Sequence, residues 1–113
     1  MPQYAVLLYE NVPPDDLPPE VQAAHGAMPG RVAEAGGRIL AGMALHESST
    51  ATAIRGDLLT DGPFIETKEE LAGVFVIEAR DLDHAVALAK MTPVVDGGVE
   101  VRPLIGFEVL EGS

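Results

Sequence analysis

The sequence predicts an α+β fold whose elements follow in the order strand, helix, strand, hairpin, strand, helix, strand. Residues 4–9 and 74–77 are short, continuous apolar runs, which indicates strands buried on both faces. Each run is followed, after a loop, by a segment in which apolar residues recur every three or four positions, as on the core-facing side of a helix. This order is typical of a ferredoxin-like sandwich, in which two helices cover one face of an antiparallel sheet.

The first helix is expected to run from Pro19 to about residue 35, after a loop rich in proline and aspartate. Proline suits the first helical position because the amide hydrogen that it lacks would have no helical partner there. The pair Gly36-Gly37 is a typical helix end. Pro29 predicts a kink, because it cannot donate a hydrogen bond to the carbonyl of His25. The core-facing stripe of this helix comprises Val21, Ala24, Met28, Val32 and Ala35.

The middle of the chain is expected to contain a second strand at residues 39–45 and a small hairpin at residues 51–60. The sequence Asp61-Gly62-Pro63 then predicts a tight turn, because glycine accepts unusual φ values and proline restricts the exit from the turn. Thr67 and Glu70 have the spacing of a capping box, which predicts a short helical step before the next strand.

Asp81 is the expected N-cap of a second helix at residues 82–91. His84, in the first turn of this helix, is expected to be exposed. A last strand is expected at residues 99–104, with a resumption at residues 107–110. The residues of the second helix expected to face inward are Leu82, Ala85, Val86 and Ala89.

Composition limits the classes of function. The chain has 113 residues, and we expect a single domain over residues 1–113. Its formal net charge of −11, with only 7 basic residues, argues against nucleic acid or an anionic membrane as a partner. The chain has no cysteine, no apolar run long enough to span a membrane and no signal-peptide pattern, so we expect a cytoplasmic location.

The apolar strands also predict a partner. Two helices can cover only one face of such a sheet, yet residues 4–9 and 74–77 are apolar on both sides. A bare apolar face of this size is unfavourable for a soluble monomer. We therefore expect a homodimer in which the second faces of two sheets pack together. Because Val99 and Val101 alternate with Glu100 and Arg102, the charged pair is expected on the dimer side.

The region around the predicted turn resembles a known family. The sequence is similar to the DGPF domain, a branch of the YCII-related proteins, at Leu59-Thr60-Asp61-Gly62-Pro63-Phe64, Glu66-Thr67-Lys68-Glu69, Leu71, Gly73, Asp81-Leu82-Asp83 and Val99-Glu100-Val101-Arg102-Pro103. The resemblance implies a dimeric α/β barrel, in which two ferredoxin-like sheets face each other. In YCII-like relatives, a histidine of the first helix partnered by an acid has been taken as a candidate active site, and His25 falls at the matching position.

Three residues are the candidate catalytic groups. His25 could act as a general acid or base, or it could be a histidine at the border of the core whose ring is hydrogen-bonded. Asp61 could assist it, although aspartate before glycine often holds a turn. His46 could converge with His25 and an acid on a metal, or it could be a solvated loop residue. We expect no resident metal and no cofactor.

Arg102, Glu100 and Glu66 are the candidate ligand-binding residues. Arg102 suits a carboxylate ligand because its guanidinium is always charged and forked, or it could simply pair with Glu100 or Glu66. Two functions of different class remain open. The first is a cofactor-free enzyme that moves a proton on a small organic acid or lactone in the dimer cavity. The second is a non-catalytic ligand-sensing or assembly module.

Overall fold

The computed structural model describes residues 1–65 and 68–110. The observed order of elements confirms the predicted one. The strands and helices are β1 (Gln3–Glu10), α1 (Pro19–Glu34), β2 (Arg38–Ala44), β3 (Thr52–Arg55), β4 (Leu58–Asp61), β5 (Leu71–Glu78), α2 (Leu82–Ala89) and β6 (Gly97–Pro103). Within these residues, no helix is both long and apolar enough to cross a lipid bilayer.

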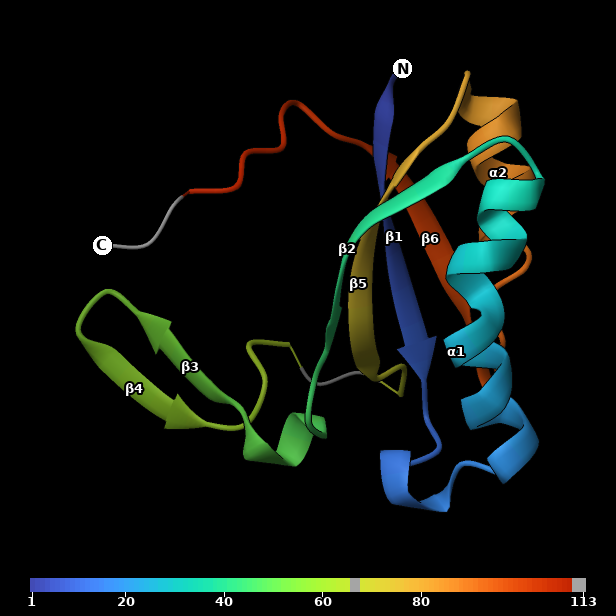
Figure 1. The fold of residues 1–113 in the computed structure, drawn as a ribbon. Coiled ribbons are helices and arrows are strands. Elements are labelled where there is room, and N and C mark those ends of the chain that lie inside the picture. The colour runs from blue at the N-terminus through green and yellow to red at the C-terminus, as the bar shows by residue number, and fades with distance from the viewer. Residues whose placement is uncertain (66–67, 111–113) are drawn as a thin grey trace.

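Four strands form one antiparallel sheet in the order β2-β5-β1-β6. Both helices lie on the same side of this sheet (Figure 1). This confirms the α+β, ferredoxin-like prediction. The strands β3 and β4 pair only with each other, as a separate hairpin that projects away from the sheet (Figure 1).

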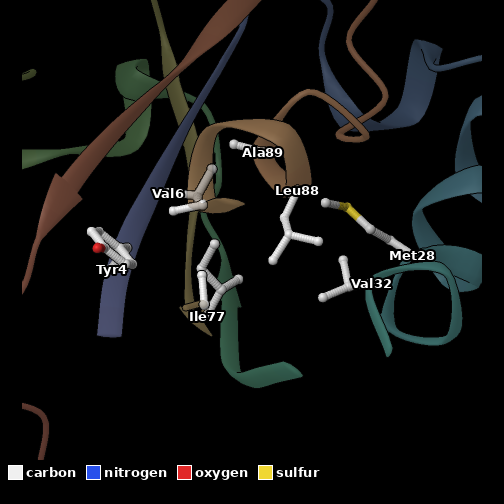
Figure 2. Close-up of a cluster of buried hydrophobic side chains, with 9 residues drawn as sticks. Tyr4, Val6, Met28, Val32, Ile77, Leu88 and Ala89 are labelled. Carbon is white, nitrogen blue, oxygen red and sulfur yellow. The ribbon is translucent and has the colours of Figure 1, made fainter. Parts of the chain in front are cut away.

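The core lies between the helices and the sheet. Val32 and Met28 of α1 point toward Leu88 of α2, and Ile77 supports them from β5 (Figure 2). Val6 of β1 and Val32 are fully buried. In β6, Val99 and Val101 pack against this core, as their alternation with charged residues predicts.

Of the four residues predicted to face inward on α2, two are buried and two are exposed. Ala85 and Ala89 are buried, but Leu82 is 50% exposed and Val86 is 36% exposed. Leu88, which the prediction omits, is 1% exposed. The helix begins directly after its Asp81 cap, which accepts a hydrogen bond from the His84 amide, and this start sets which side of the helix meets the sheet.

His84 is buried, so the prediction that it is exposed is wrong. Its Nδ1 accepts a hydrogen bond from the Arg80 amide at 3.0 Å, and its Nε2 lies 2.8 Å from the Ala35 carbonyl oxygen. Because an amide can only donate, the ring is neutral with its proton on Nε2, which donates to Ala35. The ring therefore links the start of α2 to the end of α1.

We expect His84→Ala to lower the free energy of unfolding by about 2 kcal/mol, because two backbone groups would lose their partner. Urea denaturation followed by circular dichroism measures this change. Ala87→Ser, on the exposed side of the same helix, is the control, and it should stay within about 0.5 kcal/mol of the wild type. An equal loss in both variants would contradict the assigned role of the ring.

Two further local predictions differ from the structure. Residues 68–70 form no helical step, and the Glu70 amide donates instead to Asn11 Oδ1 at 2.9 Å. Thr67, the other half of the predicted capping box, lies outside the described residues. Residues 107–110 form no strand, since the ladder ends where the Leu104 amide donates to the Gln3 carbonyl.

Candidate functional site

A cavity of about 360 Å³ lies between α1 and the strands β1, β2 and β5. Its size is suitable for a small organic molecule. Its wall is largely apolar, with Leu8, Met28 and Phe75 among the lining side chains. Among the described residues, the polar side chains in the wall are those of His25 and Glu10.

His25 reaches this cavity from the middle of α1. It lies one turn before Met28, whose side chain is buried, so its ring is at the edge of the core and is half-buried. A half-buried imidazole that faces an apolar cavity can donate or accept a proton.

Glu10, the last residue of β1, is a buried carboxylate with 5% exposure. Its Oε1 accepts hydrogen bonds from the amides of Val12 at 3.2 Å and Asp96 at 2.9 Å, and its Oε2 accepts one from Val95 at 2.6 Å. The carboxylate therefore joins the loop that leads to α1 to the loop that leads to β6.

These contacts keep Glu10 ionised. Burial alone would raise the pKa of the carboxyl, but the three amide hydrogen bonds and the nearby charge of His25 outweigh it, so the pKa lies below its ordinary value. A fixed negative charge thus lies close to His25.

The other two candidate catalytic residues lie elsewhere. His46 lines a second cavity of about 520 Å³, together with Tyr9 and Ser48. Asp61 ends β4 in the projecting hairpin and is exposed, and the adjacent Gly62 has a φ of 99°, as the predicted turn requires. The structure does not bring His46 or Asp61 into the cavity that contains His25.

Arg102 and Glu100 lie on the sheet face opposite the helices, because they alternate with the core residues of β6. The Arg102 Nε donates to the Glu100 carboxylate, and this hydrogen bond and the charge of Glu100 raise the pKa of Arg102 further. The sheet separates this pair from His25, so one small molecule cannot contact both within a single chain. Glu66 lies outside the described residues.

No three His, Cys, Asp or Glu side chains within residues 1–65 and 68–110 are close enough together to hold a metal ion. The acid that shares the cavity wall with His25 is Glu10, which sequence reasoning missed. One signal could have found it. Tyr4 and Val6 face the core, Leu8 lines the cavity on the same side of the sheet, and Glu10 is the next position of that series.

The fold and the cavity define a small ferredoxin-like α+β protein with a ligand-sized space between its first helix and its sheet. The model of the YCII-related domain matches residues 3–108, and the chain belongs to this family. The chain is also similar to an uncharacterized protein of Rhizobium meliloti (strain 1021), with 42% identity over 50 residues. This match spans 42% of the chain and 40% of the relative, which is less than half the length of either.

Proposed function

We propose that this YCII-related protein is a homodimer that binds a small, largely apolar molecule beneath α1 and transfers a proton through His25. The observation that supports this function is the joint position of His25 and the buried Glu10 in the wall of one apolar cavity. In this role His25 exchanges a proton with the bound molecule, and Glu10 stabilises the imidazolium by its charge.

The charge of Glu10 favours a neutral ligand. The carboxylate lies in the same wall as His25, and no Lys or Arg of the described part of the chain lines this cavity, so an anion there would be repelled. The sequence suggests an organic acid bound by Arg102, but Arg102 is on the other sheet face. A neutral molecule with an acidic C–H or a carbonyl group fits this cavity better than a carboxylate does.

The open face supports a dimer. We define the open face as the sheet surface opposite the helices, formed by Ala5, Leu7, Tyr9, Val74, Val76, Glu100 and Arg102. Leu7, Val74 and Val76 are adjacent in the strand register, and none of them is fully buried. Packing against the same surface of a second chain would remove these side chains from water.

The test uses 5-nitrobenzisoxazole, a neutral aromatic molecule of suitable size. When a base removes its ring C–H proton, the N–O bond breaks and a coloured cyanophenolate forms. We expect the protein to accelerate this reaction above buffer, and His25→Ala to lower the acceleration by about 100-fold. His46→Ala and Asp61→Ala are the controls, and both should retain the rate because neither residue lines the cavity.

A second pair of variants tests the location of binding. The Cβ of a residue at position 42 would lie 3.8 Å from the Phe75 Cβ, an ordinary contact, and Gly42 lines the cavity, so the larger side chain of Gly42→Leu is expected to occupy part of it. It should abolish the reaction and the binding of the probe. Gly26→Leu, where a Cβ meets nothing within 4 Å, is the matched control on the outer side of α1 and should leave both unchanged.

The second candidate function is a ligand-binding module without catalysis. The high apolar content of the cavity wall favours it, because a single imidazole provides little machinery beyond binding. If the wild type binds the probe without accelerating its reaction, and Gly42→Leu abolishes that binding, the result would favour the ligand-binding module over proton transfer. Absence of binding would contradict both functions.

A further inference from the structure

The β3–β4 hairpin, residues 52–61, is here called the arm. Its strands pair with each other and make no extensive contact with any other described helix or strand. A two-stranded hairpin by itself has marginal stability in water. The Cα radius of gyration is 15.3 Å, against about 13 Å for a compact domain of this length, because segments such as the arm extend from the body.

The arm is apolar although it is exposed. Ile54, Leu58 and Leu59 are 63%, 61% and 65% exposed. On one side of the arm, Arg55 stacks over the Phe64 ring of its own chain, with its guanidinium carbon 4.2 Å from the ring centre. On the other side, Ile54 and Leu59 are cross-strand partners and share one face. Within residues 1–65 and 68–110, this Ile54–Leu59 face is left uncovered.

The direction of the arm indicates what covers it. The arm leaves the sheet on the side away from both helices, which is the side of the open face (Figure 1). Residues 104–110 leave the opposite end of the sheet on the same side (Figure 1), and Ile105, Val109 and Leu110 are exposed there as well. A molecule seated on the open face would therefore lie between two apolar projections.

The area of the open face supports the same conclusion. Four strands of about 7 residues, with a rise of about 3.3 Å per residue and a spacing of about 4.8 Å, have a projected area of roughly 440 Å². A stable interface buries about 800 Å² per partner. In projection the sheet face offers about half of this area, and the exposed apolar side chains of the arm could extend it on the same side of the chain.

We propose that each arm packs its Ile54–Leu59 face against the second copy of the chain that occupies the open face. This inference rests on the homodimer of the proposed function. The second copy that covers the open face in the proposed homodimer would also meet the arm, because both lie on the side of the sheet away from the helices (Figure 1). The groove between them is lined by Tyr9 and Leu71 from the sheet and by Pro63 and Ile65 from the segment after the arm.

The test is the dissociation constant of the full chain, measured by sedimentation velocity over a range of concentrations. Ile54→Glu/Leu59→Glu should weaken the dimer at least about 100-fold, because two apolar anchors would be replaced by charges. The matched control is Leu82→Glu/Val86→Glu, two exposed apolar residues on the helix side, which should leave the constant unchanged. In a second variant, Gly-Gly replaces residues 53–60 and so deletes the arm. This deletion should weaken the dimer by the same factor as the two glutamates, while the amide signals of the core in the NMR spectrum persist.

The possible outcomes distinguish failure of the arm contact from failure of the homodimer. A wild-type dimer whose constant changes neither with the two arm glutamates nor with the deletion would overturn the arm contact and leave the homodimer intact. Equal weakening by the control would also overturn it, because the effect would then come from added charge alone. A wild-type chain that stays monomeric at 100 times the protein concentration used in the probe reaction would overturn both the arm contact and the homodimer.

Discussion

Replacing Gly97 with alanine is expected to lower the free energy of unfolding by about 3 kcal/mol. Gly97 begins β6 and faces Glu10 in the β1–β6 register. A Cβ at position 97 would overlap the Tyr9 carbonyl oxygen, which belongs to the backbone of β1 and cannot rotate away. The two strands would have to separate, and the Val95 and Asp96 amides would then move away from the Glu10 carboxylate.

Gly98→Ala is the matched control for this prediction. It is the next residue of the same strand, and a Cβ there meets nothing within 4 Å. We expect its stability to stay within about 0.5 kcal/mol of the wild type. Urea denaturation of the two variants measures the difference. Similar values for both variants would contradict the close approach of Gly97 to β1.

Glu10→Gln is expected to lower the free energy of unfolding at pH 7 by about 2 kcal/mol, and Glu10→Ala by about 3 kcal/mol. The three amides that donate to the carboxylate explain the effect. Glutamine keeps an acceptor oxygen but turns an amide group toward one of the donors. Denaturation with urea measures both changes, and Asp15→Asn, an exposed acid in the same connecting loop, is the control.

The loss in Glu10→Gln should depend on pH with a defined sign. The pKa of Glu10 in the folded protein lies below the ordinary value of 4.5. The stabilisation by the carboxylate is therefore complete above about pH 4.5 and disappears as the pH falls through the lower pKa of the folded state. The wild type and the variant should converge in stability at acid pH, and a difference that stays constant between pH 7 and pH 3 would contradict the role of the charge.

The same residue links stability to the proposed function. Glu10 joins the two loops beside the cavity, so its loss should also reduce the reaction of the probe. The reaction should be measured at a urea concentration well below the denaturation midpoint of the variant. The variant is then fully folded, so a slower reaction cannot be caused by unfolding.

Several features of the chain could be predicted from the sequence because they depend on residues close together along it. The apolar runs at residues 4–9 and 74–77 lie in the two central strands β1 and β5. The small hairpin predicted at residues 51–60 is observed as β3 and β4, which turn at Gly56-Asp57, with Gly56 at a φ of 60°. The Asp81 cap also forms as its local sequence indicates.

The candidate site was less accessible to such reasoning. His25 was recognised. The alternation of β1 places Glu10 on the core side, but the amides of Val95 and Asp96 that hold its carboxylate follow about 85 residues later, and no local pattern encodes that contact. His84 has an ordinary helix position, and its burial follows only from the Ala35 carbonyl at the end of another helix.

By itself the sequence determined the kinds and order of the elements, the turn at Gly62 and the inward alternation of β6, because strand and helix periodicity and turn chemistry are short-range properties. The tertiary structure decided which side chains share a cavity. It separated His25 from Arg102 by the thickness of the sheet, left His46 and Asp61 outside the cavity, and brought the Glu10 carboxylate to the turn before β6. These outcomes depend on how distant segments pack, and packing follows from the whole chain rather than from any one stretch.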